Sequence, residues 1–235
     1  MNKYSQWFPY RNVQDSYNNL SQALDLPRKI CDYLLDAPQG DYVPVDDNEY
    51  SRCRFWKYLF HDGARPLTKE LPTIKEKMGL LFNPDKPTEP PTAKGYRLIP
   101  QVWVKQSQTD AQTRVYVYCG REVPNDSFKL SMSIHFMIWS NYTYESNTKE
   151  EAYSRTLAIE QALIEAFVGV NMTGLGVFGY NKRVHPDCGS RPLYDGDTNV
   201  GRELVLGLEL MTTALNEPSD FNNMIPLTAN GTRLA

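Results

Sequence analysis

The stretch that decides the fold is Lys129-Leu130-Ser131-Met132-Ser133-Ile134-His135-Phe136-Met137-Ile138-Trp139. Apolar side chains occupy every second position from Leu130 to Ile138, and serine or histidine fills most positions between them. Successive side chains of a strand point to opposite faces, so this period of two is typical of a strand with one buried face. Burying the five apolar side chains contributes up to roughly 7 to 15 kcal/mol, at about 1.5 to 3 kcal/mol each.

Three other stretches alternate in the same way, and one long segment has helical spacing. The alternating stretches are Leu98 to Val104, Val115 to Cys119, and Leu204 to Leu210, the last with Glu203 and Glu209 on its other face. A capping box formed by Thr148 and Glu151 predicts a helix of about 20 residues that ends near Val168. The order β-β-β-α-β predicts an α+β fold, in which a long helix packs on one face of a largely antiparallel β-sheet.

Composition changes along the chain predict three regions. Residues 1–95 are predicted to form an N-terminal arm with short helices, from Pro27 to Asp36 and from Tyr50 to His61, followed by a proline-rich linker. Residues 96–215 hold the alternating stretches and are predicted to form the α+β core domain. Residues 216–235 have apolar side chains without periodicity and are predicted to form a C-terminal arm.

Charge and cysteine usage exclude several classes of protein. The 235 residues carry a formal net charge of −3, so no overall positive field favours tight DNA binding. The first residues do not resemble a signal peptide, and no apolar run approaches the roughly 20 residues that span a bilayer. We therefore expect no membrane association and a chain that stays in the cytoplasm where it is made. Its four scattered cysteines favour reduced thiols.

One glycine motif is a candidate for nucleotide binding. The segment from Gly174 to Gly179 matches G-x-G-x-x-G, whose glycines bring the backbone close to a pyrophosphate at the start of a helix. Here the motif follows a helix and continues into Tyr180 to Val184, which alternates like a strand. We interpret the glycines as a tight connection.

The pair His185 and Cys188 is a candidate for zinc binding or nucleophilic catalysis. A closed zinc site needs four ligands, and His61 and His135 are isolated in the sequence, so a polar loop is the favoured interpretation. An acidic cluster that includes Asp46 lacks the calcium-loop pattern and is interpreted as a hydrated loop. The sequence predicts no catalytic residue, no cofactor and no metal site.

Aromatic and apolar residues at the margins of the core predict self-association. The candidate interface residues are Trp139, Tyr142, Tyr144, Phe221, Met224 and Ile225. The first three extend the long strand beyond its core, and the last three lie in the C-terminal arm, so neighbouring copies are expected to cover them. The alternative is that both ends of the chain fold back on their own domain.

The region from about Tyr96 to Leu215 resembles tail-terminator and head-to-tail neck proteins of tailed bacteriophages. The resemblance rests on Lys129 to Trp139, Arg155 to Phe167, Thr173 to Phe178, and Gly201 to Leu210. In that family a helical region, a β-hairpin, a long strand, a capped helix, a glycine-containing turn and a closing strand follow in this order.

The resemblance implies a non-enzymatic structural protein of the virion, present in the host cytoplasm during assembly. Such proteins form a ring homo-oligomer, commonly sixfold, that terminates the tail tube and joins it to the head. The implied partners are other copies, further neck, connector and tail-tube proteins, and DNA that passes through the lumen without specific binding. Two alternatives stay open: a nucleotide- or metal-binding enzyme that uses Gly174 to Gly179 with His185 and Cys188, and a soluble assembly scaffold.

Overall fold

The computed structural model describes residues 25–40, 43–82, 95–102, 112–124, 129–147, 154–172, 176–195 and 198–211. The C-terminal arm and most of the proline-rich linker lie outside these ranges. Within them, no helix is both long enough and apolar enough to cross a membrane.

Seven strands form one mixed sheet in the described ranges: β1 (Leu98–Ile99), β2 (Arg114–Pro124), β3 (Lys129–Asn141), β4 (Asn171–Met172), β5 (Gly176–Gly179), β6 (Gly189–Asp195) and β7 (Asn199–Met211). Their spatial order is β1-β2-β3-β7-β5-β4, and β6 also pairs with β7. β1 runs parallel to β2, and the other pairs are antiparallel. The predicted α+β class is confirmed, and the sheet is mixed.

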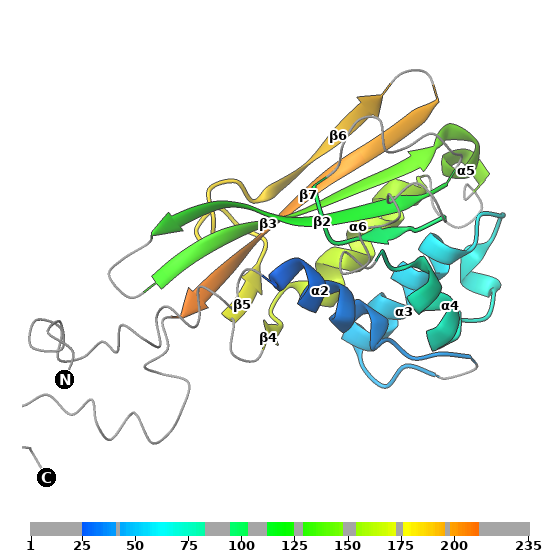
Figure 1. Cartoon of the computed structure of the whole chain (residues 1–235), viewed down its shortest axis with the longest axis horizontal. Helices are drawn as coiled ribbons and strands as arrows, with labels where there is room; N and C mark the ends of the chain where they lie inside the picture. Colours follow the sequence, from blue (N-terminus) through cyan, green and yellow to red (C-terminus); the bar gives the residue numbers. More distant parts are fainter. Residues whose placement is uncertain are drawn as a thin grey trace, which may run out of the picture.

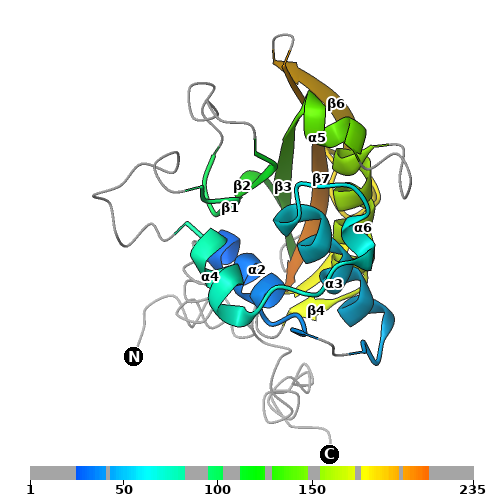
Figure 2. The same cartoon turned by 90° about the vertical axis from the view of Figure 1, so that its right-hand side faces the viewer.

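Five α-helices and one 3-10 turn accompany the sheet in the part that the structure describes: α2 (Leu26–Leu35), α3 (Asp47–Phe60), η1 (Pro66–Thr68), α4 (Ile74–Leu80), α5 (Tyr142–Asn147) and α6 (Arg155–Phe167). α6 lies along one face of the sheet, called the inner face, and α2 and α3 lie on the same side (Figures 1 and 2). The opposite side is called the outer face.

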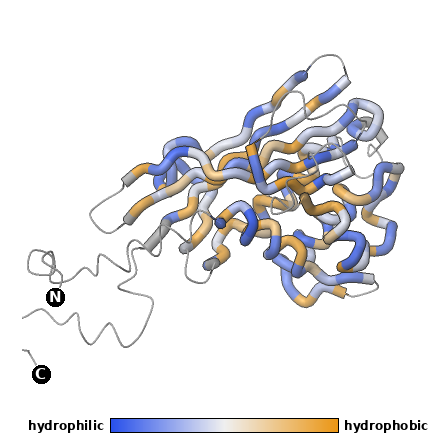
Figure 3. Tube along the Cα trace, viewed as in Figure 1, coloured by the Kyte–Doolittle hydropathy of each residue, from blue (hydrophilic) through white to orange (hydrophobic). Residues whose placement is uncertain are grey.

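The alternation that predicts β3 also builds the core. Met132, Ile134, Phe136 and Ile138 are buried on the inner face, and hydrophobic and hydrophilic residues alternate along the strands (Figure 3). β3 pairs with β7 over its whole length, and leucines of β7 lie beside these side chains in the same core. The predictions of β3 and of the strand from Leu204 to Leu210 are therefore confirmed.

The predicted helix start at Thr148 is wrong, because α6 is 13 residues long and begins at Arg155. Ser154 is extended, and its Oγ accepts a hydrogen bond from the backbone N–H of Leu157 at 3.1 Å. Glu145 of the separate helix α5 accepts from the backbone N–H of Thr156 at 3.0 Å. These two residues satisfy the free amides of the first turn, so the helix needs no further turn before Ser154.

Two further strand predictions are wrong. Of the strand expected from Leu98 to Val104, the described part, which ends at Val102, is a strand only at Leu98 and Ile99, because the backbone N–H of Gln101 donates to the carbonyl of Ile99 at 2.9 Å. The segment around Tyr180 to Val184 forms a turn in place of a strand. Its short-range hydrogen bonds replace the ladder of a sheet.

Two arginines fasten the N-terminal helices to the rest of the fold at the C-terminal end of α3. Arg97, next to β1, donates to the carbonyl of Leu59 at 2.7 Å and pairs with Asp62 at 2.6 Å. Arg155, at the start of α6, is completely buried and donates to the carbonyl of Tyr58 at 2.7 Å. Cations are favourable beside the free carbonyls of a helix end. Helices α2 and α3 thus share one hydrophobic core with the sheet.

Candidate functional site

Five polar residues meet on the outer face of the sheet, where four strands lie side by side. This outer-face cluster consists of Tyr118 on β2, Ser133 and His135 on β3, Arg191 on β6 and Glu203 on β7. The strand register places Tyr118 opposite His135 and Arg191 opposite Glu203. Since alternate residues share a face, the apolar pattern that faces α6 directs these polar side chains to the other side.

A continuous chain of hydrogen bonds joins the cluster. His135 Nδ1 lies 2.8 Å from Glu203 Oε1, and His135 Nε2 lies 3.1 Å from Ser133 Oγ. Arg191 Nε donates to Glu203 Oε2 at 2.5 Å, and the hydroxyl of Tyr118 donates to Glu203 Oε1 at 3.3 Å. The Tyr118 ring stacks on His135 with 4.8 Å between centroids. Each ring nitrogen of His135 therefore faces an oxygen, and both carboxylate oxygens of Glu203 are occupied.

Glu203 is buried, and its surroundings decide its charge. Burial alone raises the pKa of a carboxyl, but hydrogen bonds from His135 and Arg191 outweigh it and hold the pKa of Glu203 below its ordinary value. Burial and the Glu203 carboxylate together raise the pKa of Tyr118 to about 12. Glu203 is thus a carboxylate, and Tyr118 keeps its proton.

A glycine in β2 makes room for this arrangement. The β2–β3 register shifts between Cys119 and Glu122, and Gly120 lies at this irregularity. A Cβ on Gly120 would lie 2.2 Å from His135 Nε2 and 2.5 Å from Ser133 Oγ. Only a residue without a side chain leaves His135 in contact with Ser133 at this position.

The reactions that the cluster could perform are limited by how little of it a substrate can reach. A cavity of about 370 Å³ lies beside it, lined by His135, Asp187, Gly189, Ser190, Arg191, Glu203 and Val205. The order Ser133, His135, Glu203 repeats the connectivity of a serine hydrolase triad. However, Ser133 is completely buried and donates to the carbonyl of Arg121 at 3.3 Å, so its oxygen is not available to a substrate. The geometry favours a network that fixes strands β2, β3, β6 and β7.

His185 and Cys188 are packed against the outer face and do not form an open polar loop. Both are buried, and a Cβ on Gly207 of β7 would lie 2.9 Å from His185 Cβ and 3.1 Å from Cys188 Sγ. His185 Nδ1 accepts from the backbone N–H of Asp187 at 3.2 Å, and burial lowers the pKa of His185. No group of three potential metal ligands occurs among the described residues. The pair thus anchors the β5–β6 connection in the space that Gly207 leaves.

The described part of the glycine motif forms a strand. Gly176 to Gly179 form β5, which pairs with β7, and Gly179 lies opposite Gly207. β5 leads into a turn, so within the described ranges no helix start follows to hold a phosphate. Gly174 lies outside the described residues.

The candidate interface residues that the structure describes differ in exposure. The expected exposure of Trp139 is wrong: it is 3% exposed and packs with Phe82, Ile99 and Tyr116 of its own chain. Tyr142 is 61% exposed, but it begins helix α5 and does not extend β3, and Tyr144 in the same helix is half-buried. Phe221, Met224 and Ile225 lie outside the described residues.

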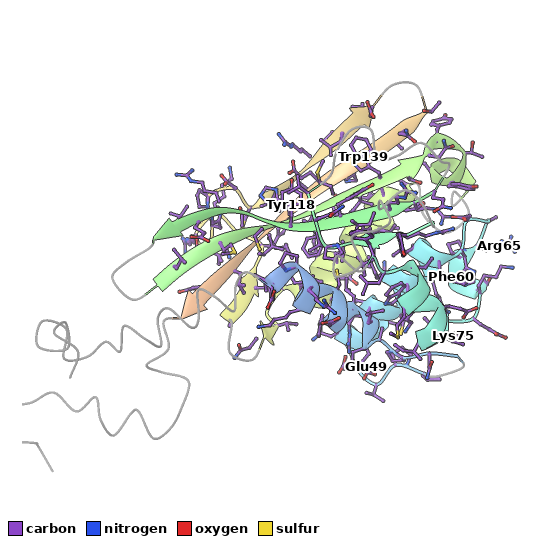
Figure 4. The ribbon with its side chains drawn as sticks, in the orientation of Figure 1. Glu49, Phe60, Arg65, Lys75, Tyr118 and Trp139 are labelled. Carbon is purple, nitrogen blue, oxygen red and sulfur yellow. The ribbon has the colours of Figure 1, made fainter. Side chains whose placement is uncertain are left out.

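The outer-face cluster was missed in the sequence because its members are far apart along the chain. Glu203 is separated from His135 by 68 positions. The signal available was a histidine and a glutamate on the polar faces of two apolar strands, which only the register can bring together. Figure 4 labels Tyr118 and Trp139 on this sheet, far from Glu49 at the start of α3.

Comparison with known proteins gives no guide to the role of this site. No protein-family model, no curated protein and no solved structure matches the chain.

Proposed function

We propose that this chain is a non-enzymatic structural protein of a tailed-bacteriophage neck, which assembles with copies of itself into a ring that ends the tail tube and joins it to the head. One observation carries the proposal: the order of elements from Arg114 to Met211. Here β2 and the long strand β3 form a hairpin, and α5, the capped helix α6, the short strands β4 to β6 and the closing strand β7 follow. A long strand, a capped helix and a closing strand stand in the same order in the family that the sequence resembles.

The outer-face cluster supports the non-enzymatic part of the proposal. The hydroxyl that contacts His135 Nε2, that of Ser133, is buried, and both oxygens of Glu203 already accept hydrogen bonds. His185 and Cys188, which the alternative enzyme would use, are buried against Gly207. Of these groups only Glu203 lines the cavity, whereas Ser133, His185 and Cys188 are buried and do not line it.

The self-association part is supported by exposed aromatic side chains at one end of the sheet. Tyr194 of β6 is 77% exposed, and Tyr142 lies at the same end, where its backbone N–H donates to the carbonyl of Thr198 at 2.9 Å. Exposed apolar surface of this kind commonly marks an interface.

The test is the mass and shape of the purified full chain, alone and mixed with connector and tail-tube proteins of the same phage. Mass photometry and negative-stain microscopy should show a closed ring, with sixfold symmetry expected, and mass spectrometry of mature particles should find the chain. A strictly monomeric chain under both conditions contradicts the proposal. Presence during assembly but absence from particles indicates a scaffold.

A further inference from the structure

An acidic patch with exposed valines is built on the connection between α2 and α3. The acidic patch consists of Val43, Val45, Asp46, Asp47 and Tyr50. Val43 and Val45 are 78% and 77% exposed, although valine is normally buried. Asp46 Oδ1 accepts from the backbone N–H of Glu49 at 2.7 Å, and Glu49 Oε2 accepts from that of Val45 at 3.0 Å. The patch is therefore held in shape before any partner arrives.

A basic turn lies in the connection between β5 and β6. It consists of the exposed residues Tyr180, Lys182, Arg183 and Pro186. Asn181 Oδ1 accepts from the backbone N–H of Arg183 at 2.9 Å, which fixes the turn locally. Val184 anchors it from below, because a Cβ on Gly179 would lie 2.6 Å from the Val184 side chain. Arg121 lies close enough for its charge to act on His185, whereas Asp187 is the opposing charge within the connection.

The two surfaces lie on different sides of the folded unit. In Figure 1 the β5–β6 connection is at the left of the sheet, whereas the start of α3 lies below and to the right. Figure 4 marks the second position by the label of Glu49. The surfaces do not meet within one chain. A head-to-tail contact can therefore place the acidic patch of one copy against the basic turn of the next, and repetition of such a contact gives a ring where the rotation between copies closes.

We propose that the acidic patch of one copy docks on the basic turn of its neighbour. This inference rests on the proposed self-assembly and assigns its contact. Asp46 and Asp47 face Lys182 and Arg183, and the two valines lose water against Tyr180. Opposite charge sets register and partner choice, and the apolar contact supplies affinity. Because both surfaces are preformed, little conformational entropy is lost on docking.

The experiment uses two full-length variants that each remove one surface. The first carries Lys182→Glu and Arg183→Glu, and the second carries Val43→Lys and Asp47→Lys, which spares the helix cap Asp46. A control variant reverses two exposed charges elsewhere, Lys69→Glu and Lys75→Glu. Circular dichroism verifies folding, and sedimentation velocity at low and high salt measures self-association.

Each surface variant alone should raise the dissociation constant of self-association about tenfold or more, and the control should behave like the wild-type chain. A one-to-one mixture of the two surface variants should recover at least a heterodimer, because the intact acidic patch of the first meets the intact basic turn of the second, and the two charge-reversed surfaces are themselves of opposite sign. Folded variants that assemble like the wild type, or a mixture without heterodimer, overturn the docking contact and leave the ring proposal standing. A wild-type chain that never assembles overturns both.

Discussion

Replacement of Glu203 by glutamine tests whether the outer-face cluster stabilises the sheet. The carboxylate accepts from His135 at 2.8 Å, from Arg191 at 2.5 Å and from Tyr118 at 3.3 Å. Hydrogen bonds to a charged group contribute about 1.5 to 3 kcal/mol each, and loss of one partner of a buried pair costs about 3 to 5 kcal/mol. The Arg191 side chain is 72% exposed and its share is screened by water, so we expect a loss of about 2 to 4 kcal/mol.

The pH dependence separates this electrostatic effect from a simple loss of packing. The folded state lowers the pKa of Glu203, so its contribution is complete above the ordinary glutamate pKa of about 4.3 and is lost as pH falls through the lower folded value. Urea unfolding of both proteins from pH 7 to pH 3 should therefore show their stabilities converging in acid. A Glu122→Gln variant on the exposed part of β2 is the control. A gap between wild type and Glu203→Gln that stays constant with pH would refute the reasoning.

Two other substitutions test single positions of the fold. Gly207→Ala places a Cβ 2.8 Å from Val184 and should cost about 1 to 3 kcal/mol in urea unfolding, whereas Gly63→Ala, with nothing within 4 Å, should be nearly neutral. Equal effects would contradict the packing argument. Lys77 donates to the carbonyls of Ala37 and Pro38, and burial lowers its pKa to about 8. Lys77 contributes stability that rises between pH 8 and about 10.4, since only the unfolded chain still holds that proton there, whereas Tyr118 and the cysteines, whose pKa values are raised, contribute the opposite slope. Wild-type stability should therefore fall less steeply with pH in this window than that of Lys77→Met, and equal slopes of the two proteins would contradict the role given to Lys77.

Elements with a strong local pattern could be predicted from the sequence. β3 and β7 follow from alternation, because each strand carries its buried face in its own residues. α2 follows in the same way from Pro27 in its first turn and from Ile30 and Leu34 on one face, all within the helix from Leu26 to Leu35. α3 likewise covers most of the predicted stretch and ends at Phe60.

Features that depend on distant residues could not be predicted. The sequence pattern predicts that Trp139 is exposed. In the structure Trp139 lies opposite Gly201 of β7, and a Cβ on Gly201 would lie 2.6 Å from the indole ring, so the absence of a side chain there makes room for Trp139. The sequence predicts the start of α6 too early, because it does not show that Glu145, from helix α5, accepts the hydrogen bond of the Thr156 backbone N–H. In both cases the residue that determines the structure lies in another element of the chain, so the local pattern of apolar residues cannot reveal it.

The parts of the sheet that are already covered within one chain bear on the proposed assembly. The inner face of the sheet is closed by α6 and by α2 and α3, and much of the outer face is closed by the β5–β6 connection and by the cluster around Glu203. A partner therefore finds few apolar side chains on the sheet faces. The strongly exposed ones, such as Val43 and Tyr194, lie on connections and at strand ends. In the proposed assembly, contacts at these connections and strand ends would join neighbouring copies and leave each sheet intact, which is compatible with the head-to-tail interfaces of a ring.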